Sequence, residues 1–139
     1  MRVLIDTNVI LDVLLKREPF YGHSQLVLLA AEEQYIHGYV SASAITDIFY
    51  VTQKSCKSKN EACALITSLV KTISIGAVDS DIIMEALDAG WDDFEDCVQY
   101  AVGEDLDVDY IITRNPRDFS NGRIEAISPE ELLNIVMPD

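Results

Sequence analysis

The sequence predicts an α/β fold, a three-layer α/β/α sandwich with a central parallel sheet of four to five strands. Short, β-branched apolar runs alternate with longer segments of helical periodicity, which is the pattern of repeated strand–helix units. The runs are apolar at nearly every position, as expected for strands that are covered on both faces. No repeat, low-complexity tract or linker interrupts the 139 residues, so we expect a single domain over residues 1–139.

Five apolar segments are predicted to be the strands of this sheet. Residues 2–5 form a short buried run that stops at Asp6, and residues 110–113 form the clearest buried strand. Residues 126–127 give the weakest signal of the five. The two remaining strands are predicted at residues 36–40 and 73–78.

The segments between these strands have helical periodicity and several helix-start signals. Ser128, Pro129 and Glu131 have the spacing of an N-cap, a first helical residue and a capping box. Asp79 with Ser80 is predicted to cap the helix that follows, and Asn8 is a candidate cap of the first helix. The predicted helices are residues 9–15, 20–33, 43–53, 61–70, 81–89, 93–103 and one that starts at 129. Apolar faces are predicted at Leu26, Leu29 and Ala30, at Ile45, Ile48 and Phe49, and at Phe94, Cys97, Val98 and Ala101.

The charge of the chain is strongly negative and unevenly distributed. The 24 acids and 10 bases give a net charge of −14, which argues against a protein that holds a phosphate backbone by bulk charge. Between Lys71 and Arg114 there is no basic residue, and this stretch carries twelve of the acids. For most of these acids a solvated helical surface is the simplest explanation.

Several functional classes are disfavoured by what the chain lacks. No apolar run approaches the roughly 18 residues of a membrane span, and the residues before Asp6 are too few for the apolar region of a secretory leader. The three cysteines have no CxxC spacing and are expected to be reduced, which predicts a cytoplasmic location. A dinucleotide fingerprint, a Walker loop and a GxSxG elbow are all missing, which argues against the common nucleotide-binding folds and a Ser/His/Asp hydrolase.

Polar residues follow two of the predicted strands at their carboxyl ends, where open parallel sheets place their functional crevice. Asp6 directly follows strand 2–5, whereas Asn115 and Asp118 lie shortly after strand 110–113. The alternative role of Asp6 is to cap the first helix, and the alternative for Asn115 is an ordinary polar turn before Pro116. Both alternatives remain open from the sequence alone.

A second group of acids opens the predicted helix 93–103. Asp93 and Asp96 are three residues apart, so both carboxylates fall on one face of its first turn. Acids there also complement the helix dipole, but four acids within five residues exceed what a cap requires. Their mutual repulsion raises pKa values unless a cation lies among them. Asp47 lies within the apolar helix 43–53, where simple solvation at the boundary is the alternative.

These oxygen ligands can converge on one crevice, and hard oxygen donors suit Mg²⁺ or Mn²⁺ rather than zinc. Two such ions roughly 3.5–4 Å apart can activate water and stabilise an in-line phosphodiester displacement. The residues concerned are Asp6, Asp47, Asp93, Asp96, Asn115 and Asp118.

Three motifs, in this order and strand context, resemble the PIN domain family, and most closely the small bacterial PIN proteins that include the VapC-type toxin ribonucleases. The motifs are residues 3–8 (VLIDTN), 93–96 (DFED) and 112–119 (ITRNPRDF), with moderate support from residues 46–50 (TDIFY). The resemblance covers nearly the whole chain. It implies the α/β/α sandwich and cleavage of RNA by a Mg²⁺- or Mn²⁺-dependent endoribonuclease, the toxin of a toxin–antitoxin pair.

Carried over by position, the resemblance implies that Asp6, Asp47 and Asp96 are the catalytic acids. Asp47 is one methylene shorter than the Glu that is usual there, and Asn115 stands where many members have a fourth Asp, so Asp118 is expected to compensate. The implied metal ligands are Asp6, Asp93, Asp96, Asn115 and Asp118, with Thr7, Asn8 and Thr113 expected to orient the acids through hydrogen bonds.

Contacts and partners complete the predictions. Lys54, Lys57, Arg114 and Arg117 are candidate RNA contacts, and ordinary solubilising charge is the equal alternative. Expected partners are an RNA substrate, an antitoxin protein and a second copy of the chain, the last because helices 20–33 and 43–70 carry more apolar residues than one small sheet needs. The rival function is a PIN-like module that binds RNA or protein without cutting, which the departures at Asp47 and Asn115 favour.

Overall fold

The computed structural model describes residues 1–137, which form five strands, seven α-helices and one 3₁₀-helix. The strands are β1 (Arg2–Ile5), β2 (His37–Ser41), β3 (Ser74–Gly76), β4 (Tyr110–Ile112) and β5 (Glu125–Ile127). The helices are α1 (Thr7–Leu14), α2 (Tyr21–Glu32), α3 (Ala42–Cys56), α4 (Lys59–Thr72), α5 (Ser80–Ala89), α6 (Phe94–Asp105) and α7 (Pro129–Val136), and the 3₁₀-helix η1 spans Pro116–Phe119.

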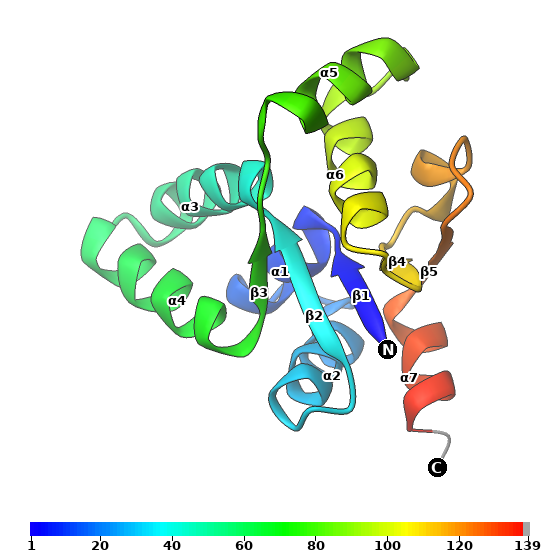
Figure 1. Ribbon diagram of the computed structural model, residues 1–139. Coiled ribbons are helices and arrows are strands. Elements are labelled where there is room, and N and C mark those ends of the chain that lie inside the picture. The colour runs from blue at the N-terminus through cyan, green and yellow to red at the C-terminus, as the bar shows by residue number, and fades with distance from the viewer. Residues whose placement is uncertain (138–139) are drawn as a thin grey trace.

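All five strands are parallel and lie in the order β3-β2-β1-β4-β5 (Figure 1). This sheet confirms the predicted fold class. β1 is central, and the chain builds outward from it first through β2 and β3, then through β4 and β5. The strand order therefore reverses between β1 and β4, and a crevice is expected outside the carboxyl ends of these two strands.

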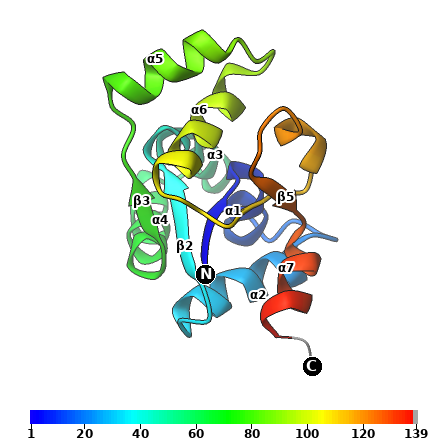
Figure 2. The same ribbon diagram turned by 45° about the vertical axis from the view of Figure 1, so that its right-hand side comes forward.

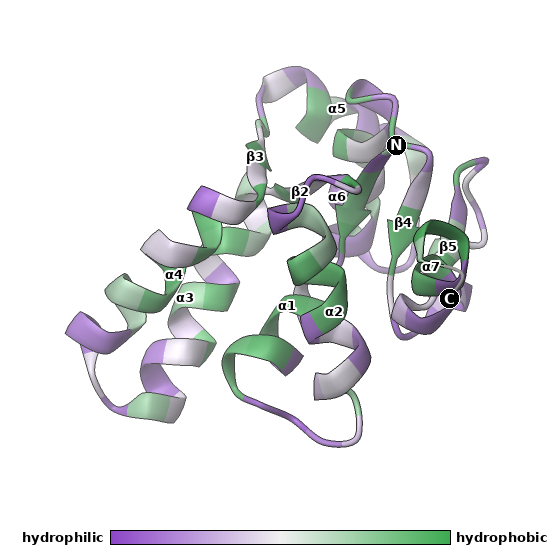
Figure 3. Cartoon of the chain, turned by 90° about the horizontal axis from the view of Figure 1, so that it is seen from below, coloured by the Kyte–Doolittle hydropathy of each residue, from purple (hydrophilic) through white to green (hydrophobic). Residues whose placement is uncertain are grey.

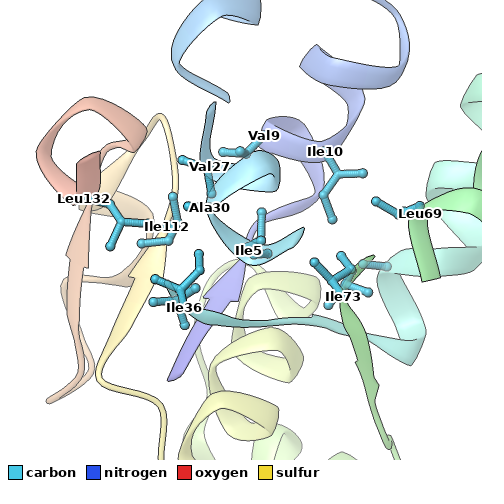
Figure 4. Close-up of a cluster of buried hydrophobic side chains, with 14 of the residues drawn as sticks. Ile5, Val9, Ile10, Val27, Ala30, Ile36, Leu69, Ile73, Ile112 and Leu132 are labelled. Atoms are coloured by element: carbon cyan, nitrogen blue, oxygen red, sulfur yellow. The ribbon is translucent and has the colours of Figure 1, made fainter. Parts of the chain in front are cut away.

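Two apolar cores flank the sheet, because successive side chains of a strand point to opposite faces. Val3 and Ile5 of β1 contribute to one core, and Leu4 between them contributes to the other. Helices α1, α2, α3, α4 and α7 pack on the first face, whereas α5 and α6 pack on the second (Figures 1 and 2). Figure 4 shows the first core, where Ile5 and Ile112 of the sheet meet side chains from the covering helices. Each fully buried Ile or Leu side chain contributes about 1.5–3 kcal/mol to the stability of the fold, relative to an exposed one.

The ends of the helices follow most of the predicted signals. Ser128 accepts a hydrogen bond from the Glu131 amide at 3.1 Å, and the Glu131 carboxylate accepts one from the Ser128 amide, so the predicted capping box is confirmed. Asp79 caps α5 through the Ile82 amide at 3.0 Å, as predicted. The prediction that Asn8 caps the first helix is wrong. The helix α1 begins at Thr7, the residue before Asn8, so Asn8 lies inside it.

Two predicted apolar faces need correction. Leu26 and Leu29 of α2 are 41% and 43% exposed, whereas Ala30 of the same predicted face is buried as expected, together with Ser24. The reason is that α2 packs on both α1 and α7, and small side chains allow this close approach. Phe94 is also exposed, because it is the first residue of α6 and lies at the open end of that helix. The other predicted core positions of α3 and α6 are buried or pack against the cores.

α3 and α4 form a hairpin that extends to one side of the sheet (Figure 1), and its distal turn is hydrophilic (Figure 3). α1, which lies close to the sheet, is largely hydrophobic in the same view. No helix within residues 1–137 has the length and apolar character that a bilayer crossing requires. The cysteines at positions 56, 63 and 97 are free thiols.

Candidate active site

An open cleft of about 430 Å³ lies at the carboxyl ends of β1 and β4. The first turn of α1, the middle of α3, the start of α6 and η1 form its walls, so it lies between α3 and α6 in Figure 1. Within residues 1–137, six acidic residues and no Lys, Arg or His line this cleft. The six are Asp6, Asp47, Asp93, Glu95, Asp96 and Asp118.

Asp6 is the most buried of these acids, with 5% of its surface exposed. Thr113 Oγ1 donates to its Oδ2 at 2.9 Å, and Gln99 Nε2 donates to its Oδ1 at 3.2 Å. Asp6 occupies the N-cap position of α1, but its side chain makes no capping hydrogen bond, so the capping alternative does not explain this carboxylate. Burial raises the pKa of Asp6, and the hydrogen bonds from Thr113 and Gln99 oppose that effect.

Asp93 and Asp96 lie at the start of α6 and both line the cleft. Asp93 is the N-cap, and its Oδ1 accepts a hydrogen bond from the Asp96 amide at 3.0 Å. Desolvation by burial, followed by the neighbouring charges of Asp93 and Asp6, raises the pKa of Asp96 to about 7. The predicted rise in pKa within this acidic group is therefore present, with burial as its largest single cause and repulsion from the neighbouring carboxylates added to it.

Two of the three other predicted ligands, Asp47 and Asp118, line the cleft, and Asn115 does not. Asp47 lies on α3 and Asp118 on η1, and both line the cleft. Asn115 is not among the lining residues, and its amide donates to Thr113 Oγ1 at 3.1 Å. The sequence did not predict η1, which begins directly after Asn115 and turns Asp118 towards the cleft. A metal-binding role for Asn115 stays a prediction.

The three residues predicted to orient the acids differ in their contacts. Thr113 is completely buried and both donates to Asp6 and accepts from the Asn115 amide. Thr7 and Asn8 line the cleft from the first turn of α1. Among residues 1–137, no side-chain hydrogen bond joins either of them to an acid. Their orienting role also stays a prediction.

Sequence reasoning missed Gln99. Its side chain is 5% exposed, lines the cleft and bonds directly to Asp6. One signal was available, since Gln99 lies three residues after Asp96 and therefore on the same face of α6. The residues on either side of it, Val98 and Tyr100, are buried, which makes a polar residue at this position unusual.

Arg114, predicted as an RNA contact, is held by a carboxylate that the sequence analysis did not single out. Asp12 is completely buried in α1, with its Oδ2 2.7 Å from Arg114 Nε and its Oδ1 3.2 Å from Nη2. The guanidinium also stacks over the Phe20 ring, 4.0 Å from its centroid. Arg114 thus joins the end of β4 to α1, and any contact with RNA is additional to this structural role.

The other three candidate RNA contacts are exposed. Arg117 is on η1, one residue before Asp118 of the cleft. Lys54 and Lys57 lie at the distal end of α3, and Lys54 is seven residues beyond Asp47, roughly 10 Å along the helix. Binding of RNA by these residues stays a prediction.

Tyr100 joins α6 to the segment that follows η1. Its hydroxyl accepts hydrogen bonds from the backbone amides of Arg123 at 2.7 Å and Ile124 at 3.3 Å. Gly122 lies so close to the Tyr100 ring that a Cβ at this position would overlap it. The wall of the cleft that carries Asp118 is therefore fastened to the helix that carries Asp96.

The sequence of residues 2–117 matches a protein-family model that is described as PIN domain. The chain belongs to the PIN domain family. The resemblance inferred from the three sequence motifs is confirmed. In this PIN domain the motif at residues 3–8 spans the end of the central strand β1 and the Asp6 that follows it.

Solved structures share this fold at low sequence identity. VapC20 of Mycobacterium tuberculosis, a Sarcin-Ricin loop cleaving toxin, has a TM-score of 0.69 and 13% identity over 86% of this chain and 95% of that chain. VapBC2 from Rickettsia felis, bound to a DNA fragment from their promoter, has a TM-score of 0.69 and 13% identity over 92% and 98%. A toxin–antitoxin complex from Klebsiella pneumoniae has a TM-score of 0.66 and 20% identity over 91% and 97%. A search of curated protein sequences found no match.

The donor chemistry of the cleft in this PIN domain suits a divalent cation. Among the described residues, six carboxylates and no His or Cys line it, and oxygen-only sites favour Mg²⁺ or Mn²⁺. Within the described residues, no three Asp, Glu, His or Cys side chains are placed to hold one metal ion together. Mg²⁺ commonly binds through one or two carboxylates and keeps several waters, so a site with fewer protein ligands is consistent with this ion.

Proposed function

We propose that this PIN domain is a Mg²⁺- or Mn²⁺-dependent endoribonuclease that hydrolyses RNA phosphodiester bonds. The observation that carries the proposal is a cleft at the β1–β4 switch point that, within residues 1–137, has six acidic residues and no basic one. The side-chain donors that its most buried carboxylate has among these residues are neutral. Such a cluster needs a cation to offset its mutual repulsion and burial. Membership of the PIN family supports RNA cleavage as the chemistry.

Each residue of the cleft has a distinct part in this proposal. Asp6 and Asp96 are the proposed principal ligands, with Asp93, Asp47 and Asp118 close enough to add negative charge. When bound, the cation supplies positive charge beside the scissile phosphodiester and lowers the pKa of water. Thr113, the residue that follows β4, orients the Asp6 carboxylate through its hydrogen bond to Oδ2. Lys54, Lys57, Arg114 and Arg117 are the proposed contacts to RNA, because an acidic chain needs local basic groups to approach phosphates.

The test is cleavage of RNA by the purified chain with Mn²⁺, read by mapping new 5′ ends in total RNA. Asp6→Asn is nearly isosteric and removes one charge from the proposed ligand set, so we expect cleavage to fall below detection. Asp88→Asn is the matched control, because Asp88 is an exposed acid on α5 that lies outside the cleft, and it is expected to cut like the wild type. A wild type that cuts no RNA, or an Asp6→Asn variant that cuts normally, contradicts the proposal.

A second candidate is a PIN module that binds RNA or protein without cutting. It is favoured by Asn115, which brings no charge and does not line the cleft, and by the lack of a three-ligand group among residues 1–137. The same assay separates the two candidates. Cleavage that appears only after Asn115→Asp supports the non-cutting module, with a site one carboxylate short of activity.

We further propose that the chain acts in the cytoplasm as a toxin that a cognate antitoxin neutralises. Solved structures with this fold include a toxin–antitoxin complex, and the free cysteines suit a reducing compartment. Inspection of the neighbouring gene identifies the candidate antitoxin. We expect the wild type to arrest growth when expressed alone and not when that protein is co-expressed, whereas Asp6→Asn is expected to be harmless in both cases.

A homodimer is the remaining proposed assembly. Within segment 43–70, on which this prediction was partly based, Ile66 and Leu69 are buried in the core and do not support it, whereas Tyr50 on α3 is exposed and does. Met84 and Leu87 on α5 are further exposed apolar side chains, and all three exposed residues are at least 60% exposed. Light scattering at micromolar concentration is expected to give twice the chain mass of 15.5 kDa, and a value of 15.5 kDa contradicts the dimer.

A further inference from the structure

We infer that Gln99 is a positioning residue of the proposed metal site, one that holds the Asp6 carboxylate through its amide nitrogen. The inference rests on the proposed function. Gln99 comes from the buried part of α6, is 5% exposed and lines the acidic cleft. It is the only neutral residue of α6 among the residues described as lining the cleft.

The orientation of the Gln99 amide is fixed by its partner. An ionised carboxylate only accepts hydrogen bonds, so the group that faces Asp6 Oδ1 at 3.2 Å is the NH₂. The amide oxygen therefore points away from Asp6. This Oε1 is completely buried and has no hydrogen-bond partner among residues 1–137. A buried acceptor left unpaired costs about 1–3 kcal/mol, so such atoms nearly always have a protein or water partner.

The unpaired Oε1 indicates what the Gln99 amide contributes at this position. The oxygen is too buried for a water molecule to touch it, and Thr7, Asn8 and Tyr50, which carry donors and line the same cleft, give it no hydrogen bond within residues 1–137. An apolar side chain at this position would avoid the cost of that unpaired acceptor. The hydrogen bond from Nε2 to Asp6 is therefore the feature that an amide supplies here and an apolar residue cannot.

The consequence for Asp6 is a carboxylate fixed from two sides without loss of charge. Thr113, directly after β4, holds Oδ2 and Gln99 from α6 holds Oδ1, and each oxygen keeps a lone pair for a cation. A Lys or Arg in place of Gln99 would neutralise the carboxylate and compete with that cation. A buried amide at this position supplies the hydrogen bond and leaves the negative charge available for metal.

The first experiment is calorimetric titration of Mn²⁺ into the wild type and two variants. Gln99→Met keeps the length of the side chain and removes both polar atoms, and we expect Mn²⁺ binding to weaken about 10- to 100-fold, the usual effect of removing a residue that orients a metal ligand. Gln25→Met makes the same chemical change at an exposed position of α2 and is expected to bind Mn²⁺ like the wild type. Thermal melts check that both variants fold.

A double-mutant cycle with Asp6→Asn separates positioning from general weakening of the fold. If Gln99 acts through Asp6, then adding Gln99→Met to Asp6→Asn weakens Mn²⁺ binding less than twofold further. Losses that multiply independently overturn the inference, because they show that Gln99 and Asp6 act separately.

A third measurement uses the wild type and stays valid if Gln99→Met fails to fold. The side-chain NH₂ resonances of Gln99 are followed by ¹⁵N NMR during a Mg²⁺ titration, and we expect them to shift with the same Kd as metal binding. Resonances that do not move at saturating Mg²⁺ overturn the inference while the proposed function stands. A wild type that binds neither Mn²⁺ nor Mg²⁺ overturns the proposed function, and this inference with it.

Discussion

Asp6 and Asp12 are two buried carboxylates on the same stretch of chain with opposite surroundings. Asp12 is completely buried but lies 2.7 Å from Arg114 Nε and 3.8 Å from Arg17 Nη1. Asp6 is nearly as buried, and its side-chain donors among residues 1–137 are the neutral groups of Thr113 and Gln99. Arg114 neutralises the Asp12 carboxylate in the contact that joins the end of β4 to α1, whereas no basic side chain lines the cleft beside Asp6 within the described residues. The difference supports a structural role for Asp12 and the proposed metal-binding role of Asp6.

The largest expected effect on stability comes from removing Arg114, which neutralises the buried Asp12. Arg114→Met leaves Asp12 buried without a cation, and removing one partner of a buried ion pair costs about 3–5 kcal/mol of unfolding free energy. Urea unfolding followed by circular dichroism measures this loss. A loss below about 1 kcal/mol, within the range of exposed ion pairs, contradicts the structural role of the pair.

Two controls sharpen that measurement. Arg117→Met changes the same residue type at an exposed position, and we expect its free energy of unfolding to stay within about 0.5 kcal/mol of the wild type. The double variant Asp12→Leu/Arg114→Met removes both charges, so it is expected to recover much of the stability that Arg114→Met loses.

The second prediction concerns Asp6, whose charge has no basic partner in the cleft within residues 1–137: a divalent cation is expected to raise the thermal stability of the protein. A ligand that binds only the native state stabilises it by about 2.7 kcal/mol at a concentration 100-fold above its Kd. Thermal melts with Mn²⁺ and with chelator measure this shift, which Asp6→Asn is expected to reduce strongly and Asp88→Asn to leave unchanged. Identical melts of the wild type with and without millimolar Mn²⁺ argue against a metal in the cleft.

A smaller effect is expected from pH in the absence of metal. Asp96 has a pKa of about 7 in the fold against 3.8 as the ordinary value, so the native state binds its proton more tightly than the unfolded chain does. This contribution to stability is fully present below about pH 4 and is lost as the pH rises through 7. Urea midpoints from pH 5 to 8 test it, and Asp96→Asn is expected to flatten the decline. A wild-type midpoint that rises over this range instead contradicts the shift in the pKa of Asp96.

The smallest effect is expected at Asn115. Asn115→Asp adds a charge near the cleft but outside its lining, so the gain in Mn²⁺ affinity is expected to be about twofold to fivefold, the size of a solvent-exposed charge interaction. Calorimetry measures it. A gain of 100-fold or more means that residue 115 reaches the metal directly.

The sequence was sufficient to predict the sheet and the place of the acids. Buried parallel strands are apolar along their whole length, and parallel topology brings their carboxyl ends to one edge, so Asp6 and Asp118 could be placed together from the sequence. Helical periodicity located a face of α2 but could not show that α1 and α7 require small residues there, which left Leu26 and Leu29 exposed.

Other features of the site depend on contacts between distant segments. Gln99 bonds to a residue 93 positions away, and Arg114 pairs with one 102 positions away, so the partner of neither residue can be identified from its local sequence. A basic residue beside an acidic site can pair within the fold or meet a substrate, and only the buried position of Asp12 shows which of these Arg114 does. Asp118 lines the cleft and Asn115 does not, because the single turn of η1 lies between them and brings Asp118 towards the cleft.

Tyr100 couples the segment that follows η1 to α6. Its hydroxyl accepts hydrogen bonds from the amides of Arg123 and Ile124, and Gly122 lies directly against its ring. We therefore expect Asp118 to keep its position relative to Asp93 and Asp96 better than relative to Asp47, which lies on α3 in the opposite wall. A change in the width of the cleft would then be a displacement of α3 relative to α6.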